Sequence, residues 1–124
     1  MKANELMPGD FVLTPIGKHA KVFDISSLNG EITVFFTPAN GDVFDLTEIK
    51  PIPLTDSILI AKRWELIRDS TDYKYYRHSK MKSSVKYVKK YGIYVLKTIC
   101  FRYVHEFQHI LCLCGKEDLA CNLL

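Results

Sequence analysis

Turn signals at short intervals constrain the first half of the chain more than any other feature. Pro8-Gly9, Asn29-Gly30 and Asn40-Gly41 separate short runs that are rich in β-branched and aromatic residues. Asn-Gly is among the strongest hairpin signals, because both residues tolerate a positive φ. The runs predict four or five short strands, which would form a small antiparallel β-barrel or a strongly curled sheet. The expected strands lie at 10–15, 20–27, 31–37 and 42–49.

A proline-containing segment separates this half from the rest. Pro51 and Pro53 cannot donate to a central ladder, so the sheet should end there. Thr55 is a good N-cap, and it predicts a short helix over 56–63.

The second half returns to strand patterns and then ends in a helix. β-Branched and aromatic runs from Trp64 to about residue 101 predict three or four antiparallel strands. Apolar residues at helical spacing predict a final amphipathic helix over 102–114, closed by Gly115. The expected fold class is α+β, with a β-barrel subdomain at 1–53 and an α+β subdomain at 54–124 that share one core.

The basic residues are concentrated in one stretch. Residues 73–105 contain nine lysines and arginines and no aspartate or glutamate, although the whole chain carries a net charge of only +3. Within 73–91, five tyrosines are interleaved with the basic residues, so nucleic acid is a candidate ligand: lysines neutralise phosphates and tyrosines stack on bases. The alternative is a solvated strand face that lysines protect from edge pairing. The candidate contacts are Lys74, Arg77, Lys80, Lys82, Lys86, Lys89 and Lys90.

The final helix contains the pentapeptide HEFQH, which matches the H-E-x-x-H signature of zinc peptidases. In such enzymes the two histidines bind zinc and the glutamate activates a water molecule. Here a zinc-hydrolase alternative would use His105 and His109 as ligands and Glu106 as the base. A structural metal site would add Cys112, which shares their helical face.

Three considerations argue against a zinc enzyme. No third ligand follows at a known spacing, and the residues after His109 leave no room for a second packed helix. Helical phase places both histidines opposite the stripe that contains Phe107 and Leu111, so they are expected to face solvent. The chain is also small for a peptidase. We therefore predict a protein that is not an enzyme and has no cofactor.

Location is inferred from the N-terminus and the cysteines. The first residues lack an apolar signal region, and no apolar run approaches the roughly 20 residues that cross a bilayer. A cytoplasmic protein without membrane contact is expected. Its four cysteines should be free and mostly buried.

Three stretches carry a resemblance to a known family. They are MKANELMPGDFV at 1–12, IKPIPLT at 49–55 and YVHEFQHILCLCGKE at 103–117. With them the chain resembles a family of small uncharacterised proteins of Bacteroides-type bacteria, often encoded beside prophage or mobile-element genes. Members tend to begin MKANELRIGN and to carry PIPLT and YVHxLQ(N/H)L.

The resemblance implies a cytoplasmic protein with no established activity. In that family the second histidine is commonly asparagine and the glutamate commonly glutamine, so zinc chemistry is not implied as a family trait. PGDFV followed by short strands is also similar to the Src-homology-like barrels that act as binding modules. The expected function is a non-enzymatic accessory or binding protein that is associated with a phage or mobile element. A protein partner or nucleic acid is its expected ligand.

Overall fold

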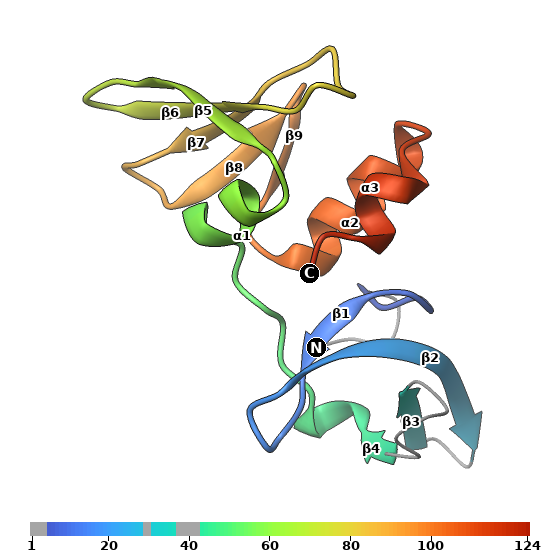
Figure 1. The fold of residues 1–124 in the computed structure, drawn as a ribbon. Helices are drawn as coiled ribbons and strands as arrows, with labels where there is room; N and C mark the ends of the chain where they lie inside the picture. The colour runs from blue at the N-terminus through green and yellow to red at the C-terminus, as the bar shows by residue number, and fades with distance from the viewer. Residues whose placement is uncertain (1–4, 29–30, 37–42) are drawn as a thin grey trace.

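The computed structural model describes residues 5–28, 31–36 and 43–124, and these residues form an α+β fold with two antiparallel sheets (Figure 1). The Asn29-Gly30 and Asn40-Gly41 turns that we predicted lie outside the described residues. In chain order the elements are β1 (Phe11–Leu13), β2 (His19–Leu28), β3 (Glu31–Phe36), β4 (Val43–Asp45), η2 (Leu46–Glu48), α1 (Asp56–Ala61), β5 (Glu65–Asp69), β6 (Tyr73–Arg77), β7 (Val85–Val88), β8 (Ile93–Leu96), β9 (Ile99–Phe101), α2 (Val104–Leu113) and α3 (Glu117–Cys121).

The N-terminal sheet is a curled antiparallel meander with the strand order β1-β2-β3-β4. After β4 the chain returns to β1, where Leu13 and Lys50 exchange two backbone hydrogen bonds of 2.9 and 3.0 Å. Apolar side chains fill the concave side because residues of one strand parity face inward. Its core consists of Leu6, Val12, Val22, Val34, Phe36, Leu46 and Ile49.

The strand predicted over 42–49 is shorter than expected. It ends at Asp45, whose carboxylate accepts a hydrogen bond of 2.9 Å from the N–H of Thr47. Glu48 accepts a bond in return from the N–H of Asp45, and this reciprocal capping begins the 3-10 helix η2. Local side-chain capping therefore overrides the alternating pattern.

Helix α1 begins where the sequence predicts. The Thr55 hydroxyl accepts a bond of 3.3 Å from the N–H of Ile58, as expected of an N-cap. The residues before α1 pair with the start of α2: the Leu54 N–H donates to Arg102 O, and the Val104 N–H donates to Ile52 O. Pro53, which lies between Ile52 and Leu54, has no N–H to contribute.

The second sheet is a five-stranded meander with the order β5-β6-β7-β8-β9, one strand more than the upper expectation. The additional strand arises because 93–101 is a hairpin and not one continuous strand. Lys97 adopts a left-handed backbone with φ 57°, and the chain reverses there between β8 and β9.

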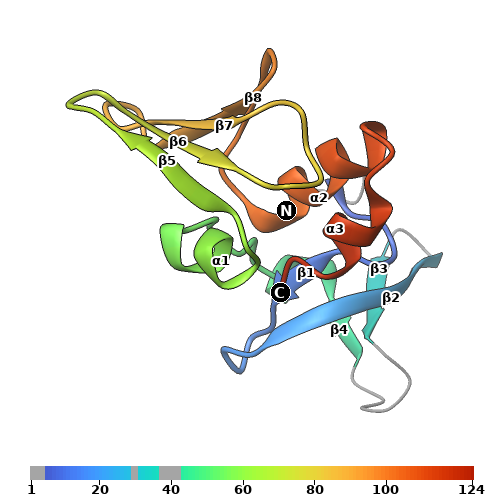
Figure 2. The ribbon, with the colours of Figure 1, turned by 45° about the horizontal axis from the view of Figure 1, so that its top comes forward.

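Helices α2 and α3 lie between the two sheets (Figures 1 and 2). Helix α2 ends before Gly115, which has the positive φ of 74° that suits a glycine C′ position. Our expectation that no second helix could pack after His109 is wrong, because α3 buries Ala120 beside α2 and Leu123 follows it into the core. This second core contains Phe11, Ile52, Leu54, Leu59, Trp64, Tyr76, Met81, Val85, Tyr94, Leu96, Phe101, Val104, Phe107, Ile110, Leu111, Ala120 and Leu123.

All four cysteines are free, as predicted, but the expectation that most are buried is wrong. Cys100 and Cys121 are exposed, and Cys112 and Cys114 are half-buried. Cys100 is exposed because it lies opposite Val95 on the side of the sheet that faces away from the core.

Candidate functional site

One side of the β5–β9 sheet is covered by no helix of the described residues. Strand alternation sends Tyr76, Val85 and Tyr94 into the core, toward the helices. Their neighbours along each strand point the other way, and α1, α2 and α3 all lie on the core side (Figures 1 and 2). We define the outer face by Glu65, Arg68, Tyr73, Tyr75, Arg77, Lys86, Val88, Ile93, Val95 and Cys100.

Aromatic and cationic groups contact one another on this outer face. The rings of Tyr73 and Tyr75 lie 6.3 Å apart, at an interplanar angle of 53°. The Lys86 ammonium lies 5.1 Å from the Tyr73 ring centre, and the Arg68 guanidinium lies 5.9 Å from that of Tyr75. The face therefore presents two aromatic rings, each with a cation beside it, above the half-buried Val88, Ile93 and Val95.

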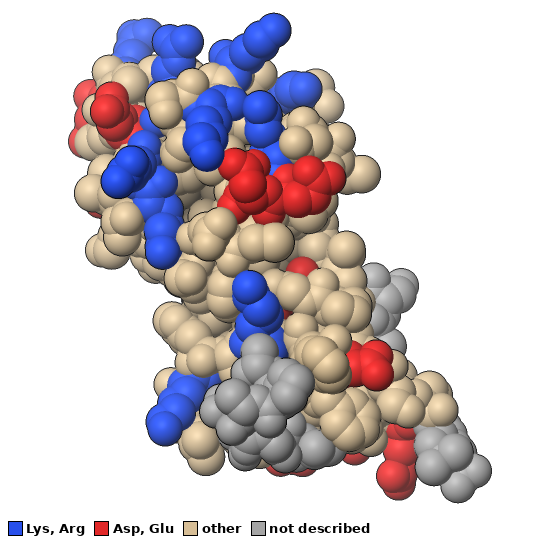
Figure 3. Space-filling view, turned by 45° about the vertical axis from the view of Figure 1, so that its right-hand side comes forward, with Lys and Arg blue, Asp and Glu red and all other residues tan. Residues whose placement is uncertain are grey.

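The structure divides the seven predicted basic residues. Arg77 and Lys86 lie on the outer face, whereas Lys74 lies on the opposite side of β6, across from Tyr87. Lys80 and Lys82 lie in the β6–β7 connection, where Lys80 forms an ion pair of 3.0 Å with Asp118. Lys89 and Lys90 lie at the β7–β8 turn. Lys89 forms an ion pair of 2.7 Å with Asp69, and the Lys90 ammonium lies 5.5 Å from the centre of the Tyr91 ring. Lysines and arginines still gather over the end of the molecule formed by this sheet (Figure 3).

Arg68 was missed because it precedes the acid-free stretch. A register shift between Leu66 and Arg68 also changes the side of the sheet to which β5 residues point. Alternation from Trp64 therefore could not place Arg68, although its position opposite Tyr75 makes it part of the outer face.

The histidine face of α2 is buried, contrary to prediction. His105 and Gln108 are each only 3% exposed, and His109 is half-buried. The N-terminal sheet packs on this side of the helix, so α2 is covered on both faces. Helical phase identified the more apolar face correctly but could not show that a polar face would also be covered.

Gln108 carries most of the hydrogen bonding at this contact. Its Oε1 accepts a bond of 2.8 Å from the N–H of Phe11, and its Nε2 donates bonds of 3.0 Å to Gly9 O and Ala120 O. We call Gly9, Asp10, Phe11, Gln108 and His109 the β1–α2 joint.

Asp10 and His109 complete the joint. His109 Nε2 lies 2.7 and 2.9 Å from the two carboxylate oxygens of Asp10, a side chain that is almost fully buried. Burial raises the pKa of Asp10, and the hydrogen bonds from the Met7 N–H and His109 offset only part of that rise. The second histidine of the HEFQH motif is therefore engaged in joining the two halves of the fold.

Glu106 points to the start of α2. Its Oε1 accepts bonds of 3.0 and 3.1 Å from the N–H groups of Arg102 and Tyr103, which caps the helix. Across residues 5–28, 31–36 and 43–124, no three His, Cys, Asp or Glu side chains are arranged to hold a metal ion. His105, His109 and Cys112 thus share a helical face without forming a ligand set.

His105 should make stability depend on pH. Burial lowers its pKa below the ordinary 6.5, and its Nδ1 has no hydrogen-bond partner among the described residues. Below pH 6.5 the imidazole of His105 binds a proton in the unfolded chain more readily than in the folded protein. This residue therefore lowers the free energy of unfolding as pH falls, by up to about 1.4 kcal/mol per pH unit. Chemical denaturation of wild type and His105→Phe between pH 7.5 and 5.5 should give a shallower slope for the variant.

Two other buried groups make the comparison of variants necessary. His78, whose pKa burial also lowers, acts in the same direction, whereas the raised pKa of Asp10 stabilises the folded state as pH falls toward 3.8. Leu113→Gln, at an exposed position of the same helix, should keep the wild-type slope. Equal slopes for wild type and His105→Phe would contradict the assignment.

Comparison of the chain with family models, curated proteins and solved structures finds no match. Within the described part of the chain, no helix has both the length and the apolar character needed to cross a membrane.

Proposed function

We propose that this is a non-enzymatic, cytoplasmic binding protein whose outer face binds single-stranded nucleic acid. The observation that carries the proposal is the Tyr73–Tyr75 pair with Arg68 and Lys86 beside the rings. Sequence-tolerant binding of single strands combines stacking on aromatic rings with cations that follow the backbone. Lys86 and Arg77 supply such cations on the neighbouring positions of the same face.

A sheet face suits single strands better than duplexes. Two tyrosines on alternate residues of one strand can each stack on an unpaired base, whereas a duplex keeps its bases inside the helix. The exposed Arg77 adds a further cation along β6, toward the β6–β7 connection, with Glu65 opposite it on β5. These features favour single-stranded RNA or DNA as the ligand.

The zinc-hydrolase alternative has less support. Glu106 is occupied in capping α2, and His109 is held by the buried Asp10. Both groups have structural roles that account for their presence in the motif.

The N-terminal half supports a second part of the proposal. We propose that its curled sheet is a Src-homology-like barrel, and the sequential strand order and the Leu13–Lys50 bridge support this interpretation. Such folds serve many unrelated functions, so the analogy names no ligand. An accessory role in a phage or mobile element rests on the family resemblance.

Reversing charge on the outer face should weaken nucleic-acid binding. In Arg68→Glu/Lys86→Glu we expect affinity for a fluorescently labelled single-stranded oligonucleotide to fall about tenfold or more near 0.1 M salt, because two phosphate contacts become repulsive. Fluorescence anisotropy measures the effect, and a plot of log affinity against log salt should become shallower.

Lys18→Glu/Lys50→Glu is the matched control, because it makes the same change in charge at exposed positions of the N-terminal half. Equal affinities for the two double variants would show that net charge alone drives association. Tyr75→Ala should weaken binding further than Tyr75→Phe, since loss of base stacking costs about 1–3 kcal/mol per base whereas phenylalanine can still stack.

A further inference from the structure

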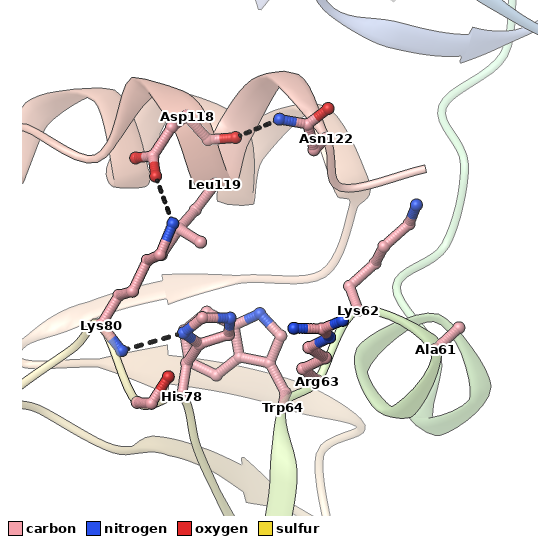
Figure 4. A pocket seen from close by; sticks show the side chains of 10 residues that line it. Ala61, Lys62, Arg63, Trp64, His78, Lys80, Asp118, Leu119 and Asn122 are labelled. Carbon is pink, nitrogen blue, oxygen red and sulfur yellow. Dashed lines mark hydrogen bonds and ion pairs between the residues drawn. The ribbon is translucent and has the colours of Figure 1, made fainter.

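A separate pocket of about 430 Å³ lies where the end of α1, the start of the β6–β7 connection and α3 meet (Figure 4). That volume falls in the range of small-molecule sites. Its wall contains two aromatic side chains, Trp64 and His78, whose ring centres are 5.2 Å apart. Both are buried, at 2% and 6% exposure.

Both rings offer an N–H without an acceptor among the described residues. The N–H of Lys80 donates to His78 Nδ1 at 3.0 Å, so the neutral ring carries its proton on Nε2. Burial lowers the pKa of His78, which keeps the ring neutral near pH 7. The indole N–H of Trp64 can only donate. Neither nitrogen is a fully enclosed unpartnered atom, a state found only for His105 Nδ1 among the described residues, so both N–H groups can be reached from the pocket. This wall is therefore suited to a ligand with acceptor oxygens.

The charges around the pocket favour an anion. Lys62, Arg63 and Lys80 line it, and Asp118 is the one carboxylate among the described lining residues. Asp118 is paired with Lys80 at 3.0 Å, and both side chains are more than half exposed. The lining groups therefore carry a net charge of +2, which is equal in size and opposite in sign to the charge of a dianionic phosphate group.

Arg63 occupies a position where glycine is usual. It is the C′ residue of α1, with φ 67°, and the next residue, Trp64, donates its backbone N–H to Leu59 O at 3.0 Å. Gly115 fills the corresponding position after α2. An arginine in this conformation gives the protein a planar donor fork at the pocket, which glycine cannot supply.

We infer that this pocket binds a phosphate monoester group, held by the Arg63 guanidinium and by the ring N–H groups of Trp64 and His78. The group could belong to a free nucleotide or to the 5′ end of a nucleic-acid strand, which share this chemistry. The pocket does not depend on the outer face, since it uses none of the residues that define that face.

The only tryptophan of the chain supplies the readout, because its indole N–H gives a single nitrogen–proton NMR signal. Titration with inorganic phosphate or adenosine 5′-monophosphate should shift this signal saturably, whereas sodium chloride at the same ionic strength should not. Oligonucleotides with a 5′-phosphate or a 5′-hydroxyl distinguish the two sources. Tighter binding of the 5′-phosphate strand than of the 5′-hydroxyl strand assigns the site to strand ends, and equal binding of the two strands assigns it to nucleotides.

Arg63→Gly separates binding from folding. Glycine relieves the left-handed backbone, so the variant should be at least as stable as wild type, while its affinity for adenosine 5′-monophosphate should fall about tenfold or more. Lys97→Gly is the matched control: it makes the same backbone change with the same loss of charge at φ 57°, outside the lining of this pocket. Trp64→Phe keeps an aromatic ring but removes the N–H donor, so it should also bind adenosine 5′-monophosphate more weakly. Calorimetry measures this affinity.

Three results would overturn the inference: no saturable shift with phosphate or the mononucleotide, an equal shift with chloride, or unchanged affinity in Arg63→Gly. Arg68→Glu/Lys86→Glu should retain the wild-type response to adenosine 5′-monophosphate. Loss of oligonucleotide binding in that double variant and loss of mononucleotide binding in Arg63→Gly therefore report on two different sites.

Discussion

Replacing Gln108 with leucine is expected to lower the free energy of unfolding by about 3–5 kcal/mol. Leucine fills similar space but removes three hydrogen bonds. It leaves the Phe11 N–H and Gly9 O without that partner, whereas Ala120 O still accepts from the Leu123 N–H. A buried group that loses its partner costs about 1–3 kcal/mol, which makes the amide of Gln108 more important than its volume. Urea denaturation followed by circular dichroism measures the loss.

The control for this variant is Leu113→Gln, the reverse substitution at an exposed position of the same helix. It should change stability by no more than about 0.5 kcal/mol. Trp64 fluorescence adds a second probe, because this residue lies in the core of the second half. Gln108→Leu should also move the circular dichroism midpoint more than the fluorescence midpoint if the N-terminal half loosens first. An unchanged midpoint by both probes would contradict the importance of the joint.

Replacing Phe107 with alanine, on the side of α2 that faces the second sheet, is expected to lower the free energy of unfolding by about 3–5 kcal/mol. Phe107 is fully buried. The centre of its ring lies 4.9 Å from that of Phe101, on which it stacks, and 5.3 Å from that of Trp64. Alanine leaves a cavity between α2 and the second sheet, into which neighbouring aromatic rings cannot fully relax. Thermal and urea unfolding should both show the change.

Phe107→Leu provides the graded comparison, since it keeps part of the apolar volume and should cost roughly half as much. A natural domain has only about 5–15 kcal/mol of stability, so Phe107→Ala should populate the unfolded state measurably at 37 °C. Equal stabilities for the alanine and leucine variants would show that the site collapses without a cavity.

Local signals in the sequence predicted most of the elements. Thr55 marked the start of α1, Gly115 the end of α2, and the strand patterns indicated both antiparallel sheets. Errors arose where a nearby interaction competes with periodicity. Asp45 capped a 3-10 turn within an alternating run, and Lys97 reversed a run that had no glycine or proline to mark a turn.

The candidate sites were predicted less completely, because they depend on packing between distant segments. A helical wheel shows which side of α2 is apolar, but it contains no information about what approaches His105 and Gln108. Likewise, the basic stretch contributed Arg77 and Lys86 to the outer face, while Arg68 joined them only through a register shift. The phosphate pocket combines Arg63, His78 and Asp118 from three separate elements, so no short motif could reveal it.

The bond between the Phe11 N–H and Gln108 spans 97 positions of the chain, and this separation has a consequence during translation. The residues of the curled sheet leave the ribosome long before those of α2, which covers the sheet. Until α2 is synthesised, the polar edge of β1 is exposed to water. Contacts between such distant segments slow folding, and they leave incomplete surfaces available to other chains. The docking of α2 onto β1 should therefore be a late event in the maturation of the protein.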